Sequence, residues 1–206
     1  LSSALFLAVP ATAGLIAAGI PVISVIFMHG KFSYNDVLMT YNSLICAAAG
    51  IVFVSALRIA TPAFYSMKDT KTPVISASIA LVINLVLGYI LMQTPLKHAG
   101  LTLANTISAI VQMLILLTLL EKKTGGIDVF RIMKSFMKFT VSAILMSVLV
   151  IWSASFTDWE NAGVAEGIIS LVVTVTAGGT VYFLSCYLMR AEEVLFFINR
   201  IKRRLS

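Results

Sequence analysis

The chain has 206 residues, of which 59% are hydrophobic and only 12% are charged, and its formal net charge is +6. A soluble globular domain carries about 25% charged residues, so this composition excludes that class. Charge-free windows of about 20 residues recur along the chain, and each is long enough to cross a bilayer core of roughly 30 Å as a helix.

The hydropathy pattern predicts an all-α, polytopic membrane bundle with six transmembrane helices joined by short connections. The predicted spans are residues 1–28, 39–65, 73–93, 99–120, 136–154 and 167–189. No basic region precedes the first apolar run, so this run is predicted to span the membrane rather than to be a cleaved signal. Leu1 is not an initiator methionine, and the chain is therefore expected to be a fragment or the C-terminal part of a longer protein. Cys46 and Cys186 fall at opposite membrane faces in this topology and are not expected to form a disulfide.

The distribution of loop cations predicts the orientation of the spans. One side carries twelve of them, namely Lys68, Lys71, Lys122, Lys123, Arg131, Lys134, Lys138, Arg190, Arg200, Lys202, Arg203 and Arg204. The other side carries only Lys31 and Lys97. By the positive-inside rule both ends of the chain are predicted to be cytoplasmic. The net positive charge is then explained by contact with anionic membrane lipids and not by nucleic-acid binding.

The first span contains Pro10 and Pro21, which predict a kinked helix that serves either to shape the bundle or as a transport hinge. In the loop that follows, Ser33 and Asp36 have the spacing of a capping box. Asp36 is therefore predicted to cap the next helix rather than to bind substrate. His29 has no neighbouring cluster of metal-binding residues and is interpreted as an interfacial residue.

The second span contains Arg58, the one charged residue deep inside an apolar segment, with uncharged sequence on both sides over residues 37–57 and 59–67. A cation at such a depth costs at least about 2.5–3.5 kcal/mol and normally faces protein, a partner or water. Arg58 either extends to the nearby cytoplasmic interface or lines a hydrophilic cavity, where a guanidinium binds phosphate in a bidentate manner.

The third and fourth spans each carry one polar stripe at helical spacing. The stripes consist of Ser76, Ala80, Asn84 and Gly88 and of Asn105, Ser108, Ala109 and Gln112. Amides are costly in lipid, so both stripes are predicted to face the bundle interior. They serve there either as hydrogen bonds between helices or as the lining of a cavity.

The sixth span has Ser170, Thr174, Gly178 and Tyr182 at i+4 spacing, and residues 191–205 have the composition of an amphipathic surface helix. The sequence contains no metal-ligand constellation, no phosphate-binding glycine-rich loop and no nucleophile with a base partner. It therefore predicts no enzyme and no cofactor, and it favours a secondary transporter built from a helical bundle.

Four stretches carry a family resemblance. They are PATAGL (10–15), FMHGKFSYND (27–36), TPAFYSMKDTKTPV (61–74) and PLKHAGL (95–101). In this order and spacing the chain resembles the bacterial lipid II flippase family (MurJ/MviN), and the third stretch is the most specific. The last two spans match only in hydropathy and length.

The resemblance implies a MATE-like transporter of the MOP superfamily with fourteen helices, of which this chain would be the last six. It implies that residues 1–122 form four helices of the second lobe, residues 123–189 the pair that forms a lipid-tail groove, and residues 190–206 a basic cytoplasmic tail. The implied function is the flipping of lipid II from the cytoplasmic to the periplasmic leaflet of the inner membrane by alternating access. The N-terminal lobe of the same protein would complete the cavity. Arg58 is the best candidate for a pyrophosphate contact, and Asn84, Asn105 and Gln112 are further substrate-binding candidates.

Three other functions are open at this point. The substrate could be another polyprenyl-pyrophosphate-linked saccharide, such as an O-antigen or capsule unit. The chain could be a non-transporting membrane scaffold for cell-wall enzymes, for which Arg58→Ala would be silent. A membrane glycosyltransferase would need acidic catalytic residues, but Asp36, Asp158 and Glu160 lack any accompanying motif. The energy source is also open, because arginine does not titrate in a useful range.

Overall fold

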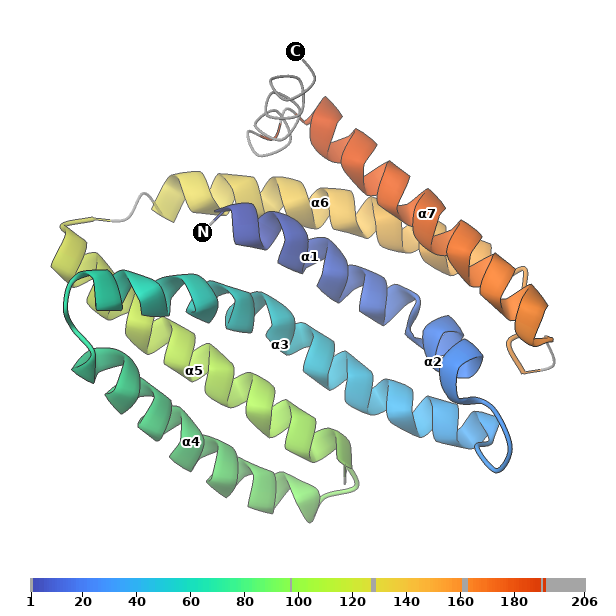
Figure 1. Ribbon diagram of the computed structural model, residues 1–206, viewed down its shortest axis with the longest axis horizontal. Coiled ribbons are helices and arrows are strands. Elements are labelled where there is room, and N and C mark those ends of the chain that lie inside the picture. The colour runs from blue at the N-terminus through green and yellow to red at the C-terminus, as the bar shows by residue number, and fades with distance from the viewer. Residues whose placement is uncertain (1, 97, 127–128, 161–162, 190, 192–206) are drawn as a thin grey trace. The chain divides into compact units, whose positions relative to one another are not determined.

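The computed structural model describes residues 2–96, 98–126, 129–160, 163–189 and 191, which form seven helices (Figure 1). The helices are α1 (Ser2–Ala17), α2 (Gly19–Phe27), α3 (Tyr34–Ser66), α4 (Lys71–Met92), α5 (His98–Thr124), α6 (Val129–Ala154) and α7 (Val164–Leu188). The predicted surface helix over 191–205 lies almost wholly outside the described residues. The prediction of an all-helical chain is confirmed for the part described.

Five of these helices, α3 to α7, contain segments long and apolar enough to cross a membrane, and the bent pair of α1 and α2 makes a sixth span if counted as one. The prediction of one kinked helix over residues 1–28 was wrong in one respect. The segment forms two helices, because α1 ends at Ala17 and α2 begins at Gly19, with a bend of 68° between them.

Pro21 explains the position of this break. A proline ring clashes with the carbonyl group four residues earlier in a continuous helix, and for Pro21 that residue is Ala17. The helix ends there, and Pro21 occupies the first turn of α2, where a missing N–H leaves no intrahelical bond unmade. Ala18 links the two helices, since its N–H donates to Gly14 O at 2.7 Å and its carbonyl accepts from Val22 N at 2.9 Å.

Pro10 lies inside α1 and does not break it. It has no N–H to donate to the carbonyl of Phe6, which is four residues earlier. The hydroxyl of Tyr182 in α7 donates to that carbonyl at 2.8 Å instead, and both residues are buried. The Phe6 ring also packs edge-on against Phe139 of α6, with 5.5 Å between centroids. The carbonyl that proline exposes is thus satisfied from another helix, as the membrane interior requires.

The chain divides into two compact units, which are described separately. Unit 1 spans Asn42–Val129 and contains most of α3 together with α4 and α5. Unit 2 joins Ser2–Tyr41 to Phe130–Ser206 and contains α1, α2, the start of α3, α6 and α7.

In unit 1, α4 and α5 form an antiparallel hairpin (Figure 1). Small residues allow these two helices to approach closely. The closest approach is at Gly100, where a Cβ atom would lie 2.6 Å from the carbonyl oxygen of Leu91. Two α5 hydroxyls also donate to α3 carbonyls, Thr102 to Ser43 at 3.2 Å and Thr106 to Cys46 at 2.6 Å. The stripe members Ser76, Ala80 and Gly88 are buried, as are Ser108 and Ala109, so the prediction that the stripes face inward is confirmed for their small residues. It is not confirmed for the amides, because Asn84 and Gln112 are half-buried and Asn105 is exposed.

In unit 2, α6 and α7 are in close contact through the predicted small stripe of α7. A Cβ atom on Gly178 would lie 2.6 Å from Cγ2 of Val150, and the Thr174 hydroxyl accepts from Ser153 at 3.2 Å.

The capping box before α3 is confirmed, because the Ser33 N–H donates to the Asp36 carboxylate at 2.8 Å and the Asp36 N–H to the Ser33 hydroxyl at 3.4 Å.

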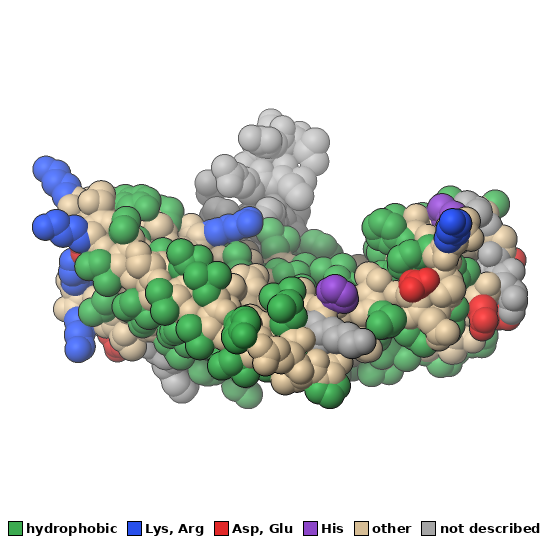
Figure 2. All heavy atoms as spheres, turned by 90° about the horizontal axis from the view of Figure 1, so that it is seen from below, with side chains coloured by type: hydrophobic (Ala, Val, Ile, Leu, Met, Phe, Trp, Pro, Cys, Tyr) green, Lys and Arg blue, Asp and Glu red, His purple; other side chains and the backbone are tan. Residues whose placement is uncertain are grey.

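The outer faces of the helices are apolar, as expected for contact with lipid. Hydrophobic side chains cover much of the face seen in Figure 2. On α4 they form an exposed row that includes Leu81, Leu85 and Tyr89. Both cysteines are free thiols.

Candidate functional site

Unit 1 contains two adjoining hollows that are lined by all four of the predicted substrate-binding residues. The first, of about 360 Å³, lies between α3 and α5 and is lined by Arg58 and Asn105. The second, of about 420 Å³, lies among α3, α4 and α5 and is lined by Asn84, Asn105 and Gln112. Val54 and Asn105 line both hollows, so the two lie on either side of these side chains.

Arg58 forms one boundary of the first hollow. Every other α3 residue that lines this hollow precedes Arg58, and the α5 lining comes from Leu101, Thr102 and Asn105 near the start of that helix. This placement agrees with the tendency of helical side chains to point toward the N-terminus of their helix. Arg58 is exposed, and the one ion pair among the residues that the structure describes is Lys123–Asp69. Arg58 is therefore available to an external anion.

The sequence reasoning missed Ser55, whose hydroxyl-bearing side chain lines the first hollow one turn before Arg58. The sequence did contain a signal for Ser55, because it lies three residues before Arg58 and residues three apart share a helix face. Arg58, Ser55 and Asn105 together offer a guanidinium, a hydroxyl and an amide, which are all able to donate hydrogen bonds to an oxyanion.

Three side chains connect the two polar stripes. The Asn84 NH₂ group donates to Asn105 Oδ1 at 3.3 Å and to the Ser108 hydroxyl oxygen at 3.2 Å. Ser108 is buried and Asn84 is half-buried, while Asn105 is exposed. The two polar stripes therefore have both of the predicted roles, because their side chains form hydrogen bonds between helices and also line a hollow.

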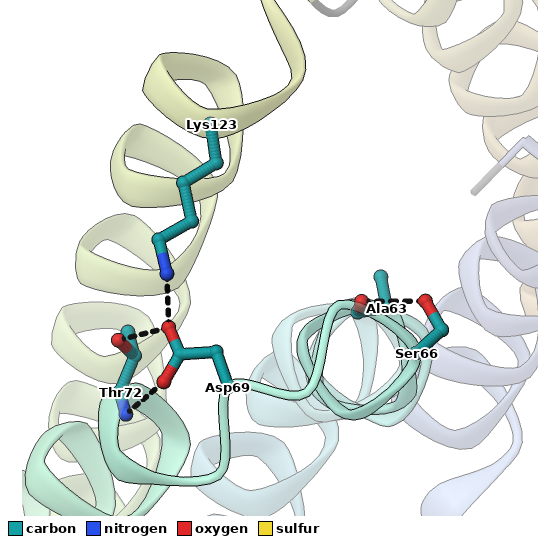
Figure 3. Close-up of polar contacts among 5 residues, drawn as sticks. All are labelled: Ala63, Ser66, Asp69, Thr72 and Lys123. Atoms are coloured by element: carbon teal, nitrogen blue, oxygen red, sulfur yellow. Dashed lines mark hydrogen bonds and ion pairs between the residues drawn. The ribbon is translucent and has the colours of Figure 1, made fainter.

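The loop between α3 and α4 is held by Asp69, which Figure 3 shows between Thr72 and Lys123. The carboxylate accepts from the Thr72 N–H at 3.0 Å and from its hydroxyl at 2.6 Å, and it pairs with the ammonium of Lys123 at the end of α5. The hydrogen bond from Lys123, followed by those from Thr72, holds the pKa of the Asp69 carboxyl well below its usual range. Lys123 also lies over the ring of Phe64, at 5.7 Å from its centroid.

These contacts show that the stretch TPAFYSMKDTKTPV (61–74) has a structural role. Phe64 is fully buried with Ala60, Leu116 and Leu120, where α3 meets α5. Asp69 caps the start of α4 and ties it to α5. The motif therefore fixes the geometry of the three helices that surround the two hollows.

Lys68 ends α3 in a left-handed conformation, with φ of 58°. The Asp69 N–H donates to Phe64 O and the Lys68 N–H to Tyr65 O, both at 3.0 Å, which is the Schellman pattern. Glycine usually occupies this position because a side chain costs about 1–2 kcal/mol there.

We expect Lys68→Gly to raise the free energy of unfolding by about 1 kcal/mol, because it removes this conformational cost. Thermal unfolding of the purified protein in detergent measures the change. Lys122→Gly is the matched control, since the same replacement within the helical last turn of α5 should lower stability by about 0.5–1 kcal/mol. If both variants are destabilised alike, the left-handed strain at Lys68 is contradicted.

Within the described residues no group of three or more His, Cys, Asp or Glu side chains could hold a metal ion. The architecture is that of a polytopic membrane protein in which a cation and amides line hollows between helices, which is the general plan of a secondary transporter.

Residues 1–169 match the family model described as lipid II flippase MurJ, and the chain belongs to this family. It is 32% identical over 200 residues to a probable lipid II flippase MurJ of Bdellovibrio bacteriovorus, covering 97% of this chain and 37% of that protein. It is 31% identical to the lipid II flippase MurJ of Thermosipho africanus, covering 84% and 34% respectively.

A solved structure of a lipid II flippase MurJ in an inward closed conformation has the same fold. Its TM-score is 0.73 at 27% identity, over 90% of this chain and 36% of that chain. The chain thus spans a little over a third of the length of the relatives it matches. The family is one of membrane transporters and not of enzymes, and it resides in the bacterial inner membrane as a multi-pass protein.

Proposed function

We propose that this chain is the C-terminal, six-span portion of a flippase that moves lipid II from the cytoplasmic to the periplasmic leaflet by alternating access. The observation that carries the proposal is the position of Arg58, which is exposed and lines a hollow together with Asn105. The pyrophosphate of lipid II would bind there, and Asn84 and Gln112 would form the wall of the adjoining hollow. The N-terminal lobe of the same full-length protein would complete the cavity.

We assign residues 1–122 to the second lobe of this transporter and residues 123–189 to a helix pair that takes the polyprenyl tail. Both ends would be cytoplasmic, and the basic residues of that side, including the tail, would contact anionic lipids. Two arrangements support this sidedness. Lys68, Lys71 and Lys123 lie at one end of unit 1. In unit 2, His29 and Trp159 come from two of the three loops predicted on the opposite side, and they line one small cavity.

We expect Arg58→Ala in the full-length protein to weaken lipid II binding by roughly ten- to a hundredfold, because a hydrogen bond to a charged group contributes about 1.5–3 kcal/mol. Native mass spectrometry with added lipid II measures the affinity. Arg58→Lys keeps the charge but loses the bidentate geometry, so its affinity for lipid II should lie between those of the wild type and Arg58→Ala.

Lys71→Ala is the matched control, since it removes a cation from the first turn of α4, outside both hollows. It should bind lipid II as the wild type does. Equal binding by Arg58→Ala and the wild type would contradict the proposed site. Preference of the wild type for a different polyprenyl saccharide would contradict the proposed substrate.

A further inference from the structure

The orientation of the Asn105 carboxamide is determined by its neighbours, beginning at Ser108. The Ser108 hydroxyl lies 2.9 Å from the carbonyl oxygens of Ala104 and Asn105. A carbonyl oxygen can only accept, so the single hydroxyl proton of Ser108 is directed at the backbone. The Ser108 oxygen can then only accept a hydrogen bond from any further partner.

That further partner is Asn84, 3.2 Å away. Because Ser108 must accept, the Asn84 atom that faces it has to be the NH₂ group and not the carbonyl oxygen. The same nitrogen lies 3.3 Å from the side chain of Asn105 and has a second hydrogen to donate. The Asn105 atom that faces Asn84 is therefore Oδ1.

The oxygen and the nitrogen of a carboxamide point in different directions from the carbon that they share. With Oδ1 turned toward Asn84, the Asn105 NH₂ group is turned away from it. Asn105 lines both hollows, whereas Asn84 lines only the second. The donor end of Asn105 is thus the end available to the first hollow, where Arg58 lies.

We propose that Asn84 and Ser108 are positioning residues that hold Asn105 as a hydrogen-bond donor beside Arg58, so that the first hollow selects a phosphate oxyanion. This inference rests on the proposed function and refines it. An oxyanion has only acceptor atoms, so an inverted Asn105 would present an oxygen to it and oppose binding. Asn84 acts through Asn105 and does not contact the ligand.

We call the orientation of Asn105 by Asn84 and Ser108 the relay. A double-mutant cycle in the full-length protein tests it, with lipid II as the probe. Asn105→Leu removes the donor and should weaken binding by roughly ten- to a hundredfold, the effect of one hydrogen bond to a charged group. Asn84→Leu frees the Asn105 carboxamide to rotate and should weaken binding by a similar factor or less. In the Asn105→Leu background, Asn84→Leu should have no further effect.

The same variants should bind undecaprenol, which has the tail without the pyrophosphate, as tightly as the wild type does. A general disturbance of the fold would weaken both ligands. Ser108→Ala is a second and more conservative test, because it removes the acceptor that orients Asn84. Its effect on lipid II binding should also vanish in the Asn105→Leu background. Thr118→Ala removes another α5 hydroxyl that is bonded to backbone carbonyls but lies outside both hollows, and it should leave binding unchanged.

The outcomes separate the relay from the proposed function. If the Asn84 and Asn105 effects multiply, Asn84 contacts the ligand directly and the relay is wrong. If Arg58→Ala weakens binding while Asn84→Leu and Ser108→Ala are both silent, the relay is wrong and the site stands. If Arg58→Ala and Asn105→Leu both bind as the wild type does, the proposed site itself fails.

Discussion

Replacing Tyr182 with phenylalanine should lower the free energy of unfolding by about 1–3 kcal/mol. The change keeps the ring in its aromatic cluster and removes only the hydroxyl that donates to the Phe6 carbonyl. That carbonyl is buried, and Pro10 has already removed its ordinary helical donor. The loss of a buried hydrogen bond of this kind costs about this much.

The physical reason can be tested separately with Pro10→Ala. Alanine restores an N–H four residues after Phe6, so Tyr182→Phe should cost about 1 kcal/mol less in that background. Unfolding of all four proteins in detergent gives the coupling. Tyr187→Phe is the matched control, since this tyrosine is in the same helix but 52% exposed, and it should change stability by less than about 0.5 kcal/mol. Additive effects of Tyr182→Phe and Pro10→Ala would contradict the proposed compensation.

Gly100→Ala should destabilise the protein by about 3 kcal/mol, at the upper end of the usual cost of overpacking. The added Cβ would lie 2.6 Å from the oxygen and 2.8 Å from the carbon of the Leu91 carbonyl group. Both are backbone atoms, so no side chain can rotate to make room. The ends of α4 and α5 would have to separate, which would also lengthen the hydrogen bond between Asn84 and Asn105.

The matched control for this prediction is Gly179→Ala in α7. Apart from its chain neighbours and the backbone of its own helix, nothing lies within 4 Å of the position that its Cβ would take, so alanine should stabilise the helix there by about 0.5–1 kcal/mol. The two alanine variants are thus expected to have opposite signs in the same thermal unfolding experiment. Equal behaviour of both would indicate that close packing at Gly100 is not what determines the result.

Features with a local or periodic signal could be predicted from the sequence. Continuous apolar runs predicted the spans, and helical spacing identified the two stripes that carry Asn84 and Asn105, whose small residues are buried. The capping box at Ser33 and Asp36 depends on residues three apart, and it too was predicted correctly.

Features that depend on distant residues could not be predicted. The partner of Asp69 is Lys123, 54 residues later, and nothing in the local sequence specifies that pair. The donor to the Phe6 carbonyl comes from Tyr182, 176 residues away. The position of the helix break was in principle accessible, because the clash of Pro21 with Ala17 is local. A proline alone does not indicate whether a membrane helix bends or stops, since neighbouring helices decide which is stable.

If α1 and α2 are counted as one span, the break at Ala18 also matches that span to the thickness of the bilayer. Residues 2–27 in one straight helix would extend about 39 Å, well beyond a hydrocarbon core of roughly 30 Å. With the 68° bend, the 16 residues of α1 and the 9 residues of α2 together reach only about 29 Å along the axis of α1. The bend therefore lets this long apolar run fit the membrane without the tilt or local thickening that hydrophobic mismatch would otherwise impose.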